Sequence, residues 1–266
     1  MLGKHGYYHY TMAALKSLTS MLYSTITKMI ENNELPTQRM RRVRSFVLRA
    51  GRMTAGQERA WRELWPRFGI EFAGKPLDLD QAFGRRAPRL LEIGFGTGEA
   101  LLTYAQRFPD YDCIGVEVHR PGVGHFMLRA HEAQLGNVRV LCHDAVEVLT
   151  SALPQNSLDA VHLFFPDPWH KKRHHKRRLL QAPFVDLLAG VVKTDGIVRL
   201  ATDWEQYAEQ MLEVMSAHAA FANLASTALE SASGFSVRPD HRPMTRFERR
   251  GHRLGHNVWD LAFKRK

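Results

Sequence analysis

An aspartate held between two prolines, with a dense cationic run behind it, is the feature of this sequence most able to do chemistry. Asp167 lies in the segment F-F-P-D-P-W (164–169), and the next nine residues, 170–178, contain six Lys or Arg and three His. The apolar run 160–165 is typical of a buried strand. Ligands of open α/β sheets bind beyond the carboxyl ends of the strands. A rigid acidic corner at such an end, next to cations, predicts chemistry on a polyanion.

A glycine-rich turn, L-L-E-I-G-F-G-T-G-E (90–99), follows the first expected strand. Gly94, Gly96 and Gly98 allow the backbone to approach a ligand closely. The dinucleotide fingerprint needs G-x-G-x-x-G, but Glu99 occupies the position of its third glycine. A pyrophosphate would also face Glu92 and Glu99, which carry the same sign of charge. A cationic or zwitterionic cofactor fits better, and S-adenosylmethionine carries both a sulfonium and an ammonium group.

Two more carboxylates follow the next two expected strands. Glu117 lies 25 residues after Glu92, at the end of the second strand, where nucleotide-binding folds place a ligand for ribose hydroxyls. Asp144 ends the third strand, where its side chain can accept a hydrogen bond from an adenine amine. Asp144 is also a candidate helix N-cap with Glu147 at N3, and the two roles are compatible.

Strands and helices alternate through most of the chain. We expect strands at 89–93, 112–118, 138–142, 158–165, 196–201, 222–228 and 258–264, and helices at 98–108, 122–135, 178–192 and 204–218, with a short helix after Asp144. This alternation predicts an α/β fold with a mostly parallel, seven-stranded sheet and helices on both faces.

Three regions are expected along the chain: a flexible N-terminal extension (1–35), a basic helical arm (36–75) and a catalytic domain (76–266), with a linker at 76–88. The first 30 residues contain no acidic side chain, as in a transit peptide, but arginine first appears at Arg39. We interpret this segment as an extension.

Composition favours an anionic partner. The formal net charge is +10, and Cys113 and Cys142 are the two cysteines, so a thiolate zinc site and a disulfide framework are not expected. The histidines show no ligand spacing, and no apolar run is long enough to span a membrane. We expect a cytoplasmic protein that binds nucleic acid, without a metal.

Five motifs in a fixed order carry a family resemblance: E-I-G-F-G-T-G, G-V-E-V-H, F-F-P-D-P-W-H-K-K-R-H, A-T-D-W-E-Q-Y-A and T-R-F-E-R-R-G-H. From about Arg44 to the C-terminus, the chain resembles the bacterial-type tRNA (guanine-N7-)-methyltransferases. The resemblance implies the Rossmann-like class I methyltransferase fold and S-adenosylmethionine as the methyl donor. It also implies tRNA as the substrate, with 7-methylguanosine formed at position 46 of the variable loop.

The same resemblance assigns roles to single residues. The cofactor-site acids would be Glu92, Glu117, Asp144 and Asp167. The substrate-binding residues would be Lys171, Asp203, Thr245, Arg246, Phe247 and Glu248. The residues against RNA would be Arg173, His174, His175, Lys176, Arg177 and Arg178. Three of these motifs have structural alternatives: Asp203 or Thr202 as a helix N-cap, residues 245–248 as a solvated loop, and Trp169 as a packing residue rather than a base-stacking one.

Methylation of guanine N7 needs no general base, because N7 is a lone-pair nitrogen without a proton. Alignment of the reactants and stabilisation of the positive charge that moves onto the purine should supply the catalysis. We therefore expect Asp167 to accept hydrogen bonds from guanine and to stabilise the cationic ring.

Other functions are compatible with parts of the pattern. N6-adenine methyltransferases usually carry D-P-P-Y or N-P-P-F in place of P-D-P-W, and cytosine-C5 methylation needs a cysteine in a Pro-Cys turn. A nicotinamide-dependent oxidoreductase fits the glycine spacing poorly. A methyltransferase acting on another RNA base and a non-catalytic RNA-binding protein stay open as alternatives, which product analysis would separate.

Overall fold

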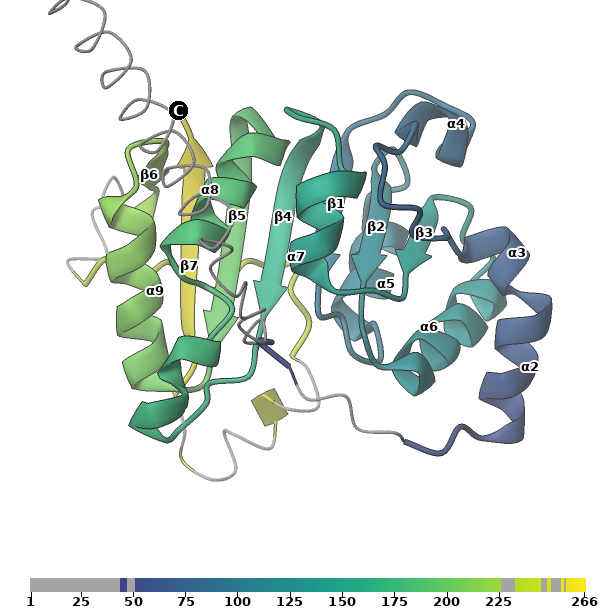
Figure 1. The fold of residues 1–266 in the computed structure, drawn as a ribbon, viewed down its shortest axis with the longest axis horizontal. Coiled ribbons are helices and arrows are strands. Elements are labelled where there is room, and N and C mark those ends of the chain that lie inside the picture. Colours follow the sequence, from purple (N-terminus) through teal and green to yellow (C-terminus); the bar gives the residue numbers. More distant parts are fainter. Residues whose placement is uncertain (1–43, 47–50, 226–232, 245–247, 250–254, 256) are drawn as a thin grey trace, which may run out of the picture. The chain divides into compact units, whose positions relative to one another are not determined.

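The computed structural model describes residues 44–46, 51–225, 233–244, 248–249, 255 and 257–266 (Figure 1). The expected extension (1–35), the first part of the expected arm (36–43) and the motif residues Thr245, Arg246 and Phe247 lie outside the described residues.

A seven-stranded sheet forms the centre of the fold, in the order β3-β2-β1-β4-β5-β7-β6 (Figure 1). The strands are β1 (Arg89–Ile93), β2 (Asp112–Val116), β3 (Val138–Leu141), β4 (Leu158–Phe164), β5 (Val192–Thr202), β6 (Phe221–Asn223) and β7 (Trp259–Arg265). β7 runs antiparallel to both neighbours, β5 and β6, and the pairs from β3 to β5 are parallel. The order reverses between β1 and β4, which is where open α/β sheets bind their ligands. The predicted mostly parallel α/β architecture is confirmed.

Helices cover both faces of this sheet. They are α2 (Ala55–Glu63), α3 (Trp65–Phe68), α4 (Leu79–Phe83), α5 (Glu99–Arg107), α6 (Arg120–Glu132), α7 (Ala145–Glu147), α8 (Ala182–Val191) and α9 (Glu205–Ala217), with a π-helical turn η1 (Val148–Ala152) and a 3-10 helix η2 (Lys172–Arg177). α4 lies inside the expected linker (76–88). Neighbouring residues fix both ends of α4. The Asp78 side chain accepts a hydrogen bond from the Gln81 N–H at the start, and Gly84, with φ 70°, ends the helix.

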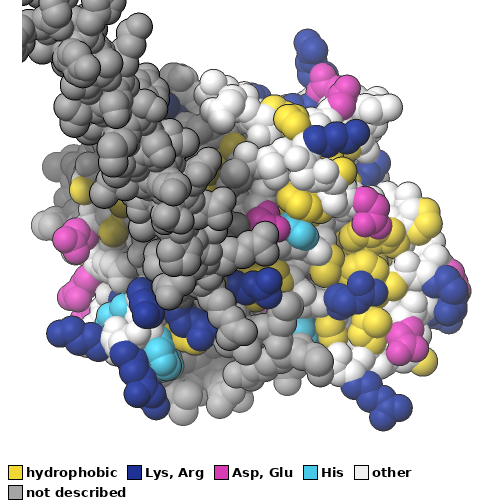
Figure 2. All heavy atoms as spheres, in the orientation of Figure 1, with side chains coloured by type: hydrophobic (Ala, Val, Ile, Leu, Met, Phe, Trp, Pro, Cys, Tyr) yellow, Lys and Arg dark blue, Asp and Glu magenta, His cyan; other side chains and the backbone are white. Residues whose placement is uncertain are grey.

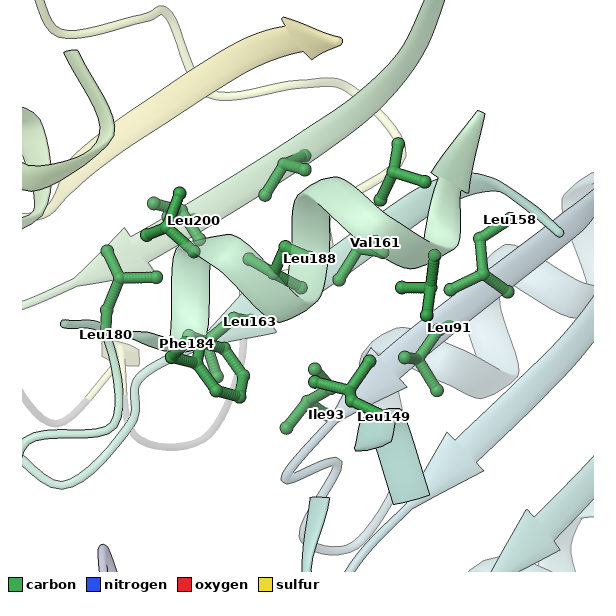
Figure 3. Packing of buried hydrophobic residues seen from close by; sticks show 14 of the residues in the cluster. Leu91, Ile93, Leu149, Leu158, Val161, Leu163, Leu180, Phe184, Leu188 and Leu200 are labelled. Atoms are coloured by element: carbon green, nitrogen blue, oxygen red, sulfur yellow. The ribbon is translucent and has the colours of Figure 1, made fainter. Parts of the chain in front are cut away.

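The alternation of side chains along each strand divides the core between the two faces. On one face, Val161 and Leu163 of β4 pack against Phe184 and Leu188 of α8 (Figure 3). On the other face, strand residues such as Leu90 contact α5 and α6. Each fully buried Leu or Phe contributes about 1.5–3 kcal/mol to folding, and these strands are therefore held firmly in register.

The described part of the expected arm packs onto the same core. Ala60 of α2 and Phe68 of α3 are buried with residues of α6, and Figure 1 shows α2, α3 and α6 together beyond β3. The Ile70 N–H donates to the Val140 carbonyl at 2.8 Å, which ties the segment after α3 to β3. The three-part domain division stays a prediction, and residues 44–266 form one compact unit.

Replacement of Gly98 by alanine tests the packing between the glycine-rich loop and α6. Gly98 has φ +77°, and an added Cβ would lie 2.2 Å from Cδ2 of Phe126. We expect Gly98→Ala to lower the free energy of unfolding by about 2–4 kcal/mol, from left-handed strain and overpacking together. Urea unfolding measures this. The control is Gly136→Ala, where an added Cβ meets nothing within 4 Å; equal losses in both variants would contradict the prediction.

Candidate functional site

The carboxyl ends of four adjacent parallel strands meet at one cavity of about 690 Å³. Its walls come from the turns after β1, β2, β3 and β4, and from residues 45–46. The lining residues include Gly94, Glu117, His119, His143, Asp144 and 163–170. A cavity of this size suits a small-molecule ligand. Four predicted site residues, Gly94, Glu117, Asp144 and Asp167, are thus brought together.

The glycine-rich loop after β1 reaches this cavity at Gly94, whereas Gly96 and Gly98 do not line it. Gly94, Gly96 and Gly98 all have positive φ, at 69°, 58° and 77°. An added Cβ at Gly94 or Gly96 would meet no atom within 4 Å. The Gly94 N–H donates to the Val116 carbonyl at 2.8 Å and continues the ladder beyond β1. Glycine is needed here because the left-handed conformation is strained for other residues.

Glu117 ties the loops after β1 and β2 together. One carboxylate oxygen accepts from the N–H groups of Val118 (2.7 Å) and His119 (2.9 Å). The other accepts from the Gly96 N–H at 2.8 Å. A carboxylate offers about four acceptor positions, so three backbone donors leave one for a ligand hydroxyl.

The turn after β3 forms part of the cavity wall. Oδ1 of Asp144 accepts from the Val146 N–H at 2.9 Å, which makes Asp144 the N-cap of α7. His143 Nε2 lies 2.6 Å from Glu147 Oε2. The ring of Phe72 stacks on His143, with centroids 3.7 Å apart and planes 16° apart. The predicted capping role of Asp144 is present, and its side chain also lines the cavity.

Glu92 is buried beneath the loop and does not line the cavity. It lies on β1 between Gly115 of β2 and His162 of β4, and its side chain is buried at 3% exposure. Burial raises the pKa of the Glu92 carboxyl to about 8. Its Oε2 has no hydrogen-bond partner among the described residues. Burial therefore favours the protonated form of this carboxyl.

The acidic corner after β4 has an unusual backbone. Phe165 and Trp169 adopt positive φ, at 52° and 48°, and each such residue costs about 1–3 kcal/mol unless its surroundings hold it there. Pro166 and Pro168 restrict the chain around Asp167. The Phe165 N–H donates to the Ala201 carbonyl at 2.7 Å. Asp167 is exposed at the cavity wall, where a bound ligand can reach it.

Trp169 is fixed by contacts on two sides. Its Nε1–H donates to the Ser45 carbonyl at 3.0 Å, and the Arg177 guanidinium lies 3.9 Å from the ring centroid. Arg177 also donates to the carbonyls of Arg44 (3.1 Å) and Phe46 (3.3 Å). The packing role predicted as one alternative for Trp169 is therefore present, and residues 45–46 close part of the cavity wall.

Three predicted substrate residues, Lys171, Asp203 and Glu248, lie outside the cavity wall. Lys171 is exposed, and Asp203 is half-buried between β5 and α9. The Trp204 N–H donates to Thr202 Oγ1 at 3.3 Å, but Trp204 is the N-cap of α9 and no side chain caps this helix. The capping role that we considered for Thr202 or Asp203 is therefore wrong. The His170 ring stacks on Trp204 at 4.2 Å between centroids, which links this turn to the corner after β4.

Glu248 is buried in an ion-pair cluster. The guanidinium of Arg242, itself 1% exposed, donates to both oxygens of Glu248 (2.7 and 3.1 Å) and both oxygens of Asp260 (2.9 and 2.8 Å). The same guanidinium lies 5.5 Å from the ring centroid of Phe165. In this structure Glu248 thus anchors one end of the T-R-F-E motif beside the corner.

The cationic run divides into exposed and buried members. Lys172, Arg173 and Lys176 are exposed on η2, and Arg178 is buried. Partial desolvation, and after it the surrounding cations, lower the pKa of His174. Figure 2 shows Lys, Arg and His side chains gathered at the lower left of the face drawn, over the segment between β4 and α8. That group suits phosphate contacts.

The sequence analysis did not single out Phe46, Phe72 or His119 as site residues. His119 had a usable signal, because it lies two residues after Glu117 within the G-V-E-V-H motif. Phe46 and Phe72 are brought to the site only by tertiary packing. In the part of the chain that the structure describes, no group of three or more His, Cys, Asp or Glu could hold a metal ion. Likewise, no helix there has the length and apolarity to cross a membrane.

Known proteins resemble the chain closely in sequence. The family described as "Putative methyltransferase" matches residues 86–261. A tRNA (guanine-N(7)-)-methyltransferase of Yersinia enterocolitica is 54% identical over 227 residues, covering 85% of this chain and 93% of the relative. A tRNA (guanine-N(7)-)-methyltransferase of Neisseria gonorrhoeae is 54% identical over 233 residues, covering 88% of this chain and 95% of the relative. Among solved structures, a 16S rRNA (adenine(1408)-N(1))-methyltransferase from Catenulisporales acidiphilia aligns with a TM-score of 0.48 and 16% identity, over 73% of this chain and 95% of that one.

The buried Glu92 predicts a pH dependence of stability. Its folded-state pKa of about 8 lies above the ordinary value of 4.5, so the folded state binds more protons than the unfolded state between these values. The contribution of Glu92 to stability is complete below pH 4.5 and is lost as the pH rises through 8. We expect wild-type stability to fall relative to Glu92→Gln with a slope of up to about 1.4 kcal/mol per pH unit.

Urea unfolding of the ligand-free proteins from pH 5 to pH 9 measures the difference in stability between wild type and Glu92→Gln. The contributions of the other titrating groups cancel in this difference. Glu132→Gln, at an exposed position of α6, is the control and should follow the wild type. Parallel pH profiles for wild type and Glu92→Gln would show that Glu92 ionises normally.

Proposed function

Because the chain belongs to the family of tRNA (guanine-N(7)-)-methyltransferases, we propose that it transfers a methyl group from S-adenosylmethionine to N7 of guanosine 46 in the variable loop of tRNA. The observation that carries this proposal is the junction of an open glycine loop, two cavity-lining acids and the Asp167 corner at one cavity. The two relatives are named for guanine-N7 methylation of tRNA, and this chain aligns with 93–95% of their length.

The residues at the cavity fit S-adenosylmethionine. Gly94 and Gly96 leave room for a ligand against their backbone. Glu117 retains acceptor capacity for a ribose hydroxyl. Asp144 and His143 line the cavity, where a carboxylate and an aromatic ring can contact an adenine. The carboxyl of Glu92 lies buried beneath the loop, and one of its oxygens has no hydrogen-bond partner in the described part of the chain. When bound, this cofactor supplies an electrophilic methyl group on a sulfonium.

Asp167 is placed to position the guanine. Its exposed carboxylate can accept hydrogen bonds from guanine N–H donors and favours the positive charge that develops on the purine. No proton has to leave N7, so the carboxylate serves orientation and charge stabilisation. The two prolines and the contacts of Trp169 fix the corner before the reaction, which lowers the cost of alignment.

The tRNA would be held by cations around this corner. Lys171 and the exposed members of η2 would contact phosphates, which position a substrate without reading its sequence. Asp203 and residues 245–247 remain our candidates for substrate contact. The relatives' name and two cysteines without a disulfide support a reaction in the cytoplasm.

Replacement of Asp167 by asparagine tests the catalytic assignment. We expect Asp167→Asn to lower kcat by about 100-fold or more, because a charge acting on the developing cation is lost. Its tRNA Kd should stay within about twofold of the wild-type value, since phosphate contacts dominate binding. Asp110→Asn, which removes an exposed carboxylate elsewhere, is the control. Near-normal turnover by Asp167→Asn would overturn the assignment.

Nucleoside analysis tests the position that is methylated. Unmodified tRNA incubated with the protein and labelled S-adenosylmethionine should yield 7-methylguanosine by mass spectrometry. A tRNA carrying adenosine at position 46 should yield none, whereas a guanosine replaced in another loop should have no effect. Methylation of a different base would retain the methyltransferase and change its substrate atom. Tight tRNA binding without any transfer would favour the non-catalytic alternative.

A further inference from the structure

We propose that Arg178, the last cation of the basic run, is a positioning residue that holds the Asp167 corner against α9 and makes no contact with RNA. This inference rests on the proposed function, because it concerns the geometry of the methyl-transfer site. It also divides the run by role: the exposed cations of η2 face the substrate, and Arg178 faces the protein.

Burial separates Arg178 from the other cations of the run. Arg178 is 3% exposed, whereas Lys172, Arg173 and Lys176 are exposed. A phosphate contact requires a side chain that reaches the surface. A buried guanidinium is tolerated only where its donors are satisfied within the protein.

The donors of Arg178 are directed at the corner, at α9 and at His175 of η2, whose Nε2 lies 3.2 Å from a terminal nitrogen of the guanidinium. Its Nε–H donates to the Pro168 carbonyl at 2.8 Å. One terminal nitrogen donates to Gln210 Oε1 at 2.7 Å and to the Gln206 carbonyl at 3.4 Å. The guanidinium also lies 4.8 Å from the ring centroid of Tyr207. Three of these partners, at 206, 207 and 210, lie on α9.

The Pro168 carbonyl is a sensitive point of the corner. This carbonyl belongs to the peptide between Pro168, the residue after Asp167, and Trp169. Trp169 has a strained φ of 48°. A charge-assisted hydrogen bond to this carbonyl fixes the orientation of the peptide. Loss of the bond would allow the corner to relax, and a displacement of about 1 Å can cost 100-fold in rate.

The fork of the guanidinium is required for this role. Arg178 bonds simultaneously with the Pro168 carbonyl and the Gln210 side chain. A lysine ammonium is a point charge without the planar fork that spans two such acceptors. Charge alone therefore does not replace Arg178, whereas charge alone largely suffices for contact with phosphate.

Three variants test the proposal in methyl transfer and in tRNA binding. Arg178→Gln removes the charge and the fork, Arg178→Lys keeps the charge, and Lys176→Gln removes an exposed charge from the same run. We expect both Arg178 variants to lower kcat by about 10- to 100-fold at saturating tRNA and S-adenosylmethionine. Their tRNA Kd and its salt dependence should match those of the wild type.

Lys176→Gln should instead reduce the slope of log Kd against log salt by about 0.7–0.9, as expected for one lost phosphate contact. The proposal is overturned if Arg178→Gln keeps wild-type kcat and shows the same loss of slope as Lys176→Gln. It is equally overturned if Arg178→Lys restores full activity, because charge would then be sufficient.

Folding is checked by thermal unfolding of each variant. If Arg178→Gln does not fold, Arg178→Lys and Gln210→Ala carry the test, since Gln210→Ala removes one partner and leaves the arginine in place. Gln210→Ala should lower kcat without changing the salt slope, and unchanged kcat would count against the proposal. A wild-type protein without methyl transfer would count against the proposed function, and the salt slopes would still decide whether Arg178 contacts RNA.

Discussion

The parallel register of β1 with its two neighbours is the constraint on which the site depends. Ile93 pairs with Val116 of β2 and with Leu163 of β4, so the three strands end at one edge. Backbone hydrogen bonds from Gly94 and Phe165 extend the ladders into the turns that carry the chemistry. Side chains alternate between faces, so a slip of one residue would turn Glu117 and Asp167 away from the cavity. The buried apolar side chains on both faces prevent that slip.

A cluster of buried charged side chains lies beside the site. Arg242 joins Glu248 and Asp260 next to the rings of Phe164 and Phe165. Removal of one partner from such a cluster is costly, so the C-terminal segment is held beside the corner after β4. Glu92 differs, because burial raises its pKa and, within the residues that the structure describes, one of its oxygens has no hydrogen-bond partner. That carboxyl lies outside the cavity wall, and its burial favours the protonated form.

The strands could be predicted well from the sequence, but which charged residues are buried and which are exposed could not. β1 was located at its observed bounds because an apolar run ends at a glycine turn, whereas α4 is five residues long and too short to show a period. Lys176 and Arg178 look alike in a cationic run, and only the 3-10 turn places one outside and the other inside. The burial of Glu248 likewise depends on its ion pair with Arg242, six residues away in the sequence. Guanine N7 as the target atom rested on the family resemblance alone.

A crystal structure with S-adenosylhomocysteine would test the central claim most directly, because this product shares every group of the cofactor except the methyl. Our account predicts the ligand in the cavity after β1–β4, its ribose at Glu117, its adenine beside Asp144 and its sulfur directed to Asp167. Ordered ligand at another place, or an empty cavity at saturating concentration, would contradict it.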